Sequence, residues 1–147
     1  MDNYILNYPN NKLIKNQTSS ILSNSDSLKF HQSLKGYNKS QLHELPELSK
    51  VLNISNLLVK DESSRFGLNA FKALGASYAV SQILKKKPNV SAFCTATDGN
   101  HGRALAWSAE LYKKKCIVFV PKDTSDLRIE AISNHGAKVE KLNLNYE

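Results

Sequence analysis

Lys72 is the residue of this sequence whose position most favours covalent chemistry. It lies at the start of a stretch, residues 70–86, in which apolar side chains recur at helical spacing, and on a helical wheel it falls within the apolar arc. A lysine amine that is desolvated against apolar side chains has a lowered pKa, and its neutral form can attack a carbonyl carbon to form a Schiff base. The alternative is a first-turn lysine whose ammonium extends past small alanines into water. The spacing alone leaves both interpretations open.

A polar turn with the sequence Thr-Asp-Gly-Asn-His-Gly, residues 97–102, is the second chemical feature. It lies between an expected strand and an expected helix, where hydroxyls, glycines and free backbone N–H groups together can hold a carboxylate or a phosphate. The turn lacks the glycine fingerprint of dinucleotide-binding domains and the pattern of a P-loop. Asp98 could also be an ordinary helix N-cap. The turn is therefore a candidate anion site, and its pattern alone does not identify the ligand.

A charged stretch, residues 60–69, leads directly into Lys72. In an ordinary surface loop these charges would be solvated. Beside a reactive lysine, the same charges could position the amine or help to bind a substrate anion.

Strands and helices that alternate along the chain are expected to position these features. Helical spacing predicts helices over residues 42–52, 70–86, 99–114 and 125–135, the last with Ser125 as its N-cap and Gly136 after its end. Short apolar runs predict buried strands over residues 57–59, 90–95, 116–120 and 137–142. Three successive strand–helix–strand units predict an α/β fold, in which a parallel sheet carries helices on both faces.

The first residues differ in composition from the rest of the chain. Residues 1–28 are rich in Asn and Ser and have no sustained apolar period, which predicts a flexible N-terminal arm before a folded part at 29–147.

Composition and charge exclude several classes of protein. The chain has 147 residues, of which 41% are apolar, and no apolar run approaches the ~20 residues of a membrane span. The net charge of +7 raises the question of nucleic-acid binding, but the lysine clusters at 85–87 and 113–115 end amphipathic segments and have no interleaved aromatic residues. Cys94 and Cys116 form no CxxC pair, and no His/Cys cluster has metal-ligand spacing. We therefore expect buried reduced thiols, a cytoplasmic protein, and no metal, nucleic-acid or membrane partner.

Read together, the motifs resemble a known enzyme family. The carrying segments are K-D-E-S-x-R-F-G-x-N-x-F-K at 60–72 and T-D-G-N-H-G-R at 97–103, with F-H-x-S-x-x-G-Y at 30–37 and V-P-K at 120–122. In order and spacing they resemble the diaminopropionate ammonia-lyases, which belong to the fold-type-II pyridoxal-phosphate enzymes together with the serine and threonine dehydratases and the β-subunit of tryptophan synthase. The resemblance extends over about residues 30–147.

The resemblance implies a cofactor and a role for each motif. Lys72 is similar to the lysine that carries pyridoxal 5′-phosphate, and Asn100 to the residue that hydrogen-bonds the cofactor's 3′-hydroxyl. Residues Thr97, Asp98, Gly99, Asn100 and His101 resemble the cradle for the substrate carboxylate. Asp98 would be the base for the D-isomer and Lys72 the base for the L-isomer. The implied reaction is α,β-elimination of the amino acid 2,3-diaminopropionate to pyruvate and ammonia, and the implied assembly is a homodimer.

The sequence also departs from the family pattern. The early Thr-Pro-Leu of the family reads Ser-Gln-Leu at 40–42, and the six glycines form no glycine-rich loop for the cofactor phosphate. A second catalytic acid of the family also has no counterpart here. We therefore expect a partial chain with little activity alone. A dehydratase-like lyase, a non-catalytic remnant and a nucleotide-binding domain remain as alternatives.

Overall fold

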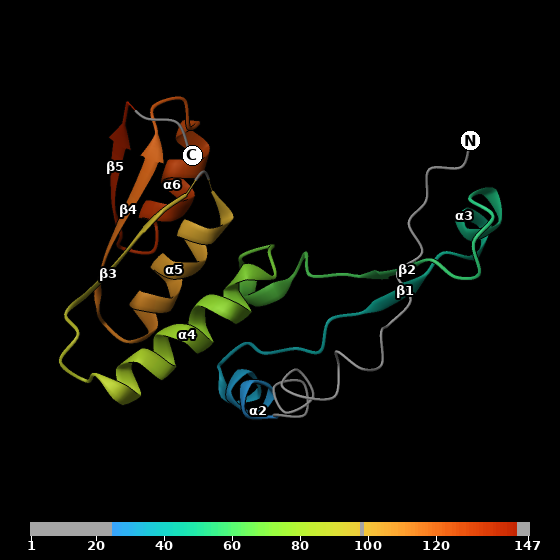
Figure 1. Ribbon diagram of the computed structural model, residues 1–147, viewed down its shortest axis with the longest axis horizontal. Helices are drawn as coiled ribbons and strands as arrows, with labels where there is room; N and C mark the ends of the chain where they lie inside the picture. The colour runs from blue at the N-terminus through green and yellow to red at the C-terminus, as the bar shows by residue number, and fades with distance from the viewer. Residues whose placement is uncertain (1–24, 98, 144–147) are drawn as a thin grey trace, which may run out of the picture.

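The structure, a computed structural model, describes residues 25–97 and 99–143. The elements follow one another as helix α2 (Asp26–Ser33), strand β1 (Leu42–Glu44), helix α3 (Pro46–Val51), strand β2 (Leu58–Lys60), the 3-10 turn η1 (Arg65–Gly67), helix α4 (Lys72–Lys86), strand β3 (Ala92–Ala96), helix α5 (Asn100–Leu111), strand β4 (Lys115–Pro121), helix α6 (Asp126–Ser133) and strand β5 (Lys138–Leu142) (Figure 1).

A three-stranded parallel sheet lies at one end of the fold (Figure 1). β3, β4 and β5 lie side by side in that order, with Cys94 opposite Ile117 and Val118 opposite Val139. α5 connects β3 to β4, α6 connects β4 to β5, and both helices lie on the same face of the sheet (Figure 1). The α/β fold class with a parallel sheet is confirmed, whereas helices on the second face stay a prediction, because α5 and α6 cover one face of the described sheet.

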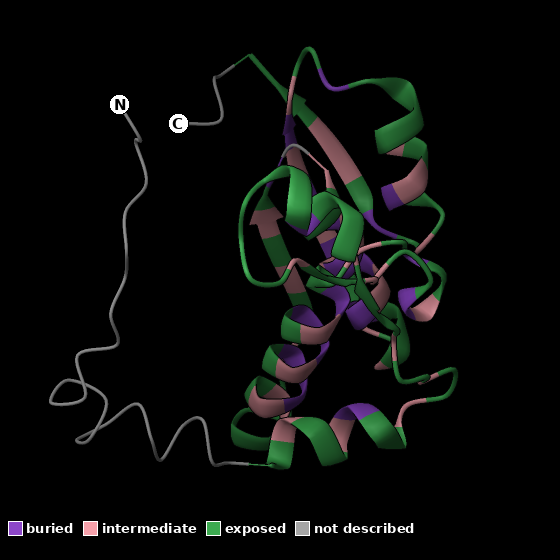
Figure 2. Cartoon of the chain, turned by 90° about the vertical axis from the view of Figure 1, so that its right-hand side faces the viewer, coloured by how far each residue is buried: buried purple, intermediate pink, exposed green. Residues whose placement is uncertain are grey.

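The hydrophobic core lies between this sheet and α5 and α6. Alternate residues of β4 are buried, because successive strand side chains point to opposite faces of the sheet. The buried cluster comprises Ala106, Ala109, Cys116, Val118, Val120, Ile132 and Ala137 (Figure 2). α4 packs along α5 and α2 packs against α4, where His31 Nε2 lies 2.8 Å from the carbonyl oxygen of Leu74.

The predicted helix over residues 42–52 is wrong in its first half. Leu42–Glu44 form β1, and the helix begins only at Pro46. Proline disfavours helical geometry in the residue before it and is well tolerated at the first position of a helix. Leu45 accordingly has a non-helical backbone, with φ −118° and ψ 71°. Pro46 therefore separates a strand from a helix within one apolar period.

The predicted buried strand at 57–59 has a different place in the structure. β2 pairs antiparallel with β1, with His43 opposite Val59, and forms a two-stranded sheet apart from the parallel one. All residues of both strands are exposed. The prediction of a buried strand that belongs to the parallel sheet is wrong here.

The two cysteines differ in environment. Cys116 is 4% exposed within the core, and burial, together with a smaller contribution from the nearby Cys94, raises the pKa of its thiol to about 11. Cys94 points to the opposite face of the sheet and is exposed, as are Ala92 and Ala96. Both thiols are free, as predicted, but the expected burial of Cys94 is wrong.

The ends of the predicted fold can be compared only in part. Residues 1–24 of the predicted arm lie outside the described residues, and Asp26–Leu28 form the first turn of α2. At the other end of the chain, Ser125 is the N-cap of α6, as predicted, and Gly136 follows the C-cap Asn134 by two residues with φ 74°.

Candidate active site

Lys72 is the first residue of α4, and its side chain is exposed. The buried positions of this helix are Ala73, Ala76, Ser77, Val80 and Ser81. Lys72 therefore lies at the margin of the buried stripe, and of the two interpretations that the sequence leaves open, the first-turn lysine that extends into water fits the described structure. The exposed position leaves the amine accessible to a ligand.

The structure brings two of the predicted motifs to one cavity. The cavity has a volume of about 210 Å³ and is lined by Lys72, Gly99, Asn100 and Arg128. A neighbouring hollow of about 220 Å³ is lined by Gly99, Asn100, Arg103, Leu127, Arg128 and Ala131. Lys72 of α4 and the start of α5 thus meet across the cavity, although they are far apart in the sequence.

Arg128 of α6 is the functional candidate that the sequence analysis missed. The carboxyl ends of parallel strands meet at one edge of a sheet, where α/β proteins bind their ligands. The segment after β4 therefore belongs beside the turn after β3, and a scan of both segments for charged side chains would have found Arg128. With Lys72 and the positive end of the twelve-residue α5, it makes the cavity favourable for negative charge.

Thr97 is buried and supports the turn internally. Its backbone N–H donates to the carbonyl of Phe119 (2.9 Å), and its hydroxyl accepts a hydrogen bond from the N–H of Gly99 (3.1 Å). Asp98, the predicted base, lies outside the described residues. His101 is exposed at the start of α5 and does not line either of the two hollows.

Gly102 sets how closely α5 approaches the sheet. A Cβ atom at this position would lie 2.5 Å from Thr97 Cγ2 and 2.7 Å from Val118 Cγ1. Only a glycine allows this approach without a shift of buried side chains. The position of Asn100, two residues earlier, therefore depends on a close contact between α5 and β4.

The loop before Lys72 is held by an ion pair whose arginine is buried. Arg65 is 6% exposed, and its Nε donates to Glu62 Oε2 (2.6 Å) while Nη2 donates to Glu62 Oε1 (3.0 Å) and to the Ser40 hydroxyl (2.9 Å). Its Nη1 donates to the carbonyl of Asn38 (2.6 Å). The hydrogen bond from Arg65 holds the pKa of Glu62 below its usual value and raises that of Arg65. A solvated loop is therefore the wrong interpretation for these two residues, which anchor the loop to the preceding segment.

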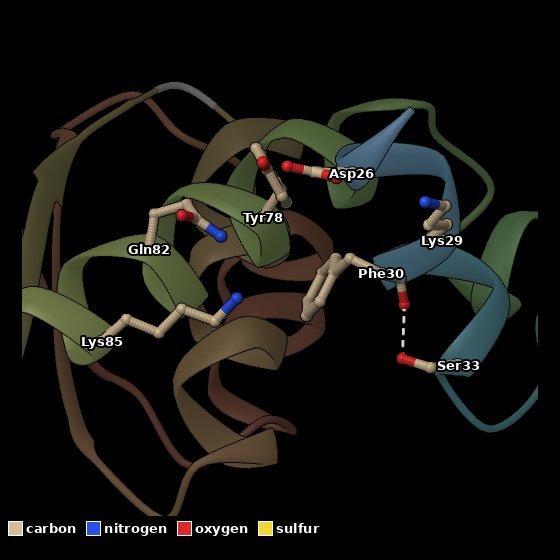
Figure 3. A pocket seen from close by; sticks show the side chains of 7 residues that line it. All are labelled: Asp26, Lys29, Phe30, Ser33, Tyr78, Gln82 and Lys85. Atoms are coloured by element: carbon tan, nitrogen blue, oxygen red, sulfur yellow. Dashed lines mark hydrogen bonds between the residues drawn. The ribbon is translucent and has the colours of Figure 1, made fainter. Parts of the chain in front are cut away.

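A larger cavity lies elsewhere and contains none of the predicted site residues. It has a volume of about 500 Å³ and is lined by Asp26, Lys29, Phe30, Ser33, Tyr78, Gln82 and Lys85. Figure 3 shows these side chains on α2 and α4, with the Ser33 hydroxyl bonded to the carbonyl of Phe30 (2.7 Å). The polar groups of this cavity do not converge with Lys72.

The described residues offer neither a metal site nor a membrane-spanning helix. Across 25–97 and 99–143, no group of three or more His, Cys, Asp or Glu side chains is placed to hold a metal ion. In the same part of the chain, no helix has the length and apolar character needed to cross a membrane.

Comparison with known proteins identifies the family. Residues 34–147 match the family described as pyridoxal-phosphate dependent enzyme. The chain belongs to this family. Pyridoxal phosphate is the cofactor of the family, and the fold of this chain is that of its fold-type-II members.

Individual relatives indicate where in the family the chain lies. It is 43% identical over 141 residues, 82% of this chain and 35% of the relative, to a diaminopropionate ammonia-lyase of Salmonella typhimurium. A crystal structure of the Escherichia coli diaminopropionate ammonia-lyase, in complex with an aminoacrylate-PLP azomethine reaction intermediate, matches 88% of this chain and 36% of that chain with a TM-score of 0.78 and 38% identity. An L-threonine dehydratase of Salmonella typhimurium is 27% identical over 104 residues, 70% of this chain and 20% of the relative. The chain thus spans about a third of the length of the ammonia-lyases.

The residues around the smaller cavity fit one end of the cofactor. A primary amine at Lys72 suits an aldehyde, the Asn100 amide can donate to a ring hydroxyl, and the cavity favours negative charge. The six glycines, all within the described residues, form no loop of the kind that would cradle the phosphate. The fit therefore concerns the reactive end of the cofactor.

Proposed function

We propose that this chain carries the reactive-lysine portion of a diaminopropionate ammonia-lyase. The whole protein would convert 2,3-diaminopropionate to pyruvate and ammonia by α,β-elimination. The observation that carries the proposal is the cavity shared by Lys72 and Asn100, which matches the roles that the resemblance gives to these residues. The identity of 43% to an ammonia-lyase supports the choice of substrate.

Each site residue has a proposed task. When bound, pyridoxal phosphate supplies an electron sink for the pair left at the substrate Cα. Lys72 Nζ would hold the aldehyde carbon of the cofactor until the substrate amine takes its place, and the released Lys72 amine would then accept the Cα proton of the L-isomer. Asp98 would accept the Cα proton of the D-isomer. Both tasks require a carboxylate and an amine in the protonation states that accept a proton.

Residues at the start of α5 would bind the cofactor ring and the substrate carboxylate. Asn100 would orient the ring hydroxyl of the cofactor, and the backbone N–H groups of Asn100 and His101 would orient the substrate carboxylate, with Gly99, whose N–H is bonded to Thr97, shaping the turn. Because the Thr97 hydroxyl already accepts a bond from Gly99, its contribution is to shape the turn. The free thiols of Cys94 and Cys116 are compatible with the proposed cytoplasmic location, and we propose a homodimer as the assembly.

A second candidate is a dehydratase-like lyase that uses the same cofactor with serine or threonine. The match to a threonine dehydratase at 27% identity is the observation that favours it. Measuring pyruvate release from L- and D-2,3-diaminopropionate, with serine and threonine as competing substrates, distinguishes the two candidates. Faster turnover of the hydroxy amino acids by the protein containing this chain would move the assignment to the dehydratases.

Covalent attachment of the cofactor tests the central residue. The chain is incubated with pyridoxal phosphate, reduced with borohydride, digested and analysed by peptide mass spectrometry. We expect the label at Lys72 and its loss in Lys72→Ala, while Lys86→Ala, at the exposed far end of the same helix, keeps it. A label spread equally over the surface lysines would contradict the role of Lys72 and favour a non-catalytic remnant.

A further inference from the structure

The loop that leads into Lys72 has an unusual backbone. Phe66, Gly67 and Asn69 all have positive φ angles, of 49°, 72° and 54°. A side chain other than glycine costs about 1 kcal/mol or more in this left-handed region. Such a conformation persists only where contacts from outside the loop stabilise it. The structure supplies these contacts from two sides.

On one side is the Arg65–Glu62 pair, and on the other is α5. The guanidinium of Arg103 donates from Nη1 to the carbonyl of Leu68 (3.1 Å) and from Nη2 to the carbonyl of Gly67 (3.4 Å). Trp107, one helical turn further along α5, stacks on Phe66 with ring centroids 4.8 Å apart and planes inclined by 29°. Residues four apart lie on one face of a helix, so this face of α5 holds the loop at successive points.

The same helix begins with Asn100, which lies on the cavity that Lys72 also lines. Arg103 is three residues from Asn100 and lines the neighbouring hollow. Its side chain therefore joins the helix that carries Asn100 to the loop that carries Lys72. The Nε of Arg103 is buried without a hydrogen-bond partner among the described residues, which marks the guanidinium as held in place at some cost.

We propose that Arg103 is a positioning residue of the active site, an inference that rests on the proposed function. By fixing the carbonyl groups of Gly67 and Leu68, its guanidinium sets the direction from which Lys72 enters the cavity beside Asn100. The planar fork of an arginine reaches both carbonyls at once, whereas a lysine at this position would reach one of them at a time. Arg103 itself takes no proton and forms no bond to the substrate.

Amide hydrogen exchange of the chain without cofactor tests whether Arg103 holds the loop before Lys72 in place. Arg103→Met keeps the apolar stem and removes the donors, and Arg103→Lys keeps a single cationic donor group. We expect amide exchange over residues 66–71 to rise about tenfold in Arg103→Met, from the loss of hydrogen bonds worth roughly 1.4 kcal/mol, and to rise less in Arg103→Lys. Exchange within β4 should stay unchanged. Lys86→Met, the matched loss of an exposed cation, should leave the loop as it is.

Trapping the cofactor on Lys72 with borohydride tests whether the loop that Arg103 holds also positions the Lys72 amine in the cavity. We expect the initial rate of labelling at Lys72 to fall in Arg103→Met, because the amine is then no longer held in one direction towards the cavity, with partial rescue in Arg103→Lys. Unchanged loop exchange, or an equal rise throughout the chain, would overturn the positioning role, and so would a loosened loop with normal labelling. A wild-type chain without label at Lys72 would instead refute the proposed function, and the exchange result would still report on the loop.

Discussion

Replacing Gly102 with alanine adds one methyl group at the contact between α5 and the sheet. The new Cβ would meet Thr97 Cγ2 at 2.5 Å, Val118 Cγ1 at 2.7 Å and Ile132 Cδ1 at 3.4 Å. These three side chains are at most 2% exposed, so none of them can rotate into solvent to make room. Either α5 moves away from β4, or the buried side chains leave their preferred rotamers.

Two opposing effects set the change in the free energy of unfolding of Gly102→Ala. Overpacking of a core by a methyl group costs about 1–3 kcal/mol. Alanine is favoured over glycine in a helix interior by about 1 kcal/mol, and by less in a first turn. The overpacking is therefore the larger effect, and we expect Gly102→Ala to lower the free energy of unfolding by roughly 1–2 kcal/mol.

Gly75 offers a matched control, because it is the other helical glycine of the described structure. A Cβ at Gly75, within α4, would meet nothing within 4 Å. Gly75→Ala should therefore raise the free energy of unfolding by about 0.5–1 kcal/mol, from helix propensity alone. The same substitution at two helical positions should thus act with opposite signs.

Urea and thermal unfolding followed by far-ultraviolet circular dichroism measure both variants. For a chain of this length, 1 kcal/mol corresponds to a shift of roughly 3 °C in Tm. If Gly102→Ala were as stable as the wild type, or more stable, α5 would not sit as close to β4 as the structure places it. Equal effects of the two substitutions would refute the reasoning from the contact distances.

Two further predictions concern single side chains. Burial raises the pKa of Cys116 from 9.0 to about 11. Because the thiol then ionises more readily in the unfolded chain, the free energy of unfolding keeps its full value below pH 9 and falls between pH 9 and 11, by at most about 3 kcal/mol. Urea unfolding at pH 8 and pH 10.5 measures this loss. The Cys116→Ala variant has no thiol to ionise at this position, so its free energy of unfolding should fall less over the same interval. Asp98→Asn should reduce turnover of D-2,3-diaminopropionate at least tenfold more than that of the L-isomer, because an amide accepts no proton. Steady-state assays on both isomers check this, and equal losses would remove the stereochemical role of Asp98.

The sequence predicts the second half of the fold closely. β4 was expected at 116–120 and spans Lys115–Pro121, and α6 was expected at 125–135 and spans Asp126–Ser133. Here β4 is a continuous apolar run, and proline or glycine lies at or just after the end of each element, so local rules are sufficient. In residues 42–60 the same apolar spacing is misleading. Pro46 divides it, and the strands around it are exposed, which an analysis based on burial cannot anticipate.

The site shows the same division between local and long-range information. The sequence analysis named Lys72, Gly99 and Asn100, and the structure places all three around one cavity. It did not find Arg128 and gave no role of its own to Arg103, which ends the T-D-G-N-H-G-R segment, because their partners come from other elements of the chain. Contacts such as that between Arg103 and the carbonyl of Leu68, 35 residues apart, have no periodic pattern in the sequence. They follow only from the way in which α4, α5 and α6 pack together.

The exposed position of Cys94 provides a natural reporter for one face of the sheet. Its thiol can react with a maleimide in the folded chain, whereas that of Cys116 is shielded by the core until the protein unfolds. Counting labels before and after denaturation therefore separates native from unfolded molecules without any mutation. A fluorophore attached at Cys94 would lie on the face opposite α5 and α6. Its emission would then report when another polypeptide surface covers that face of the sheet.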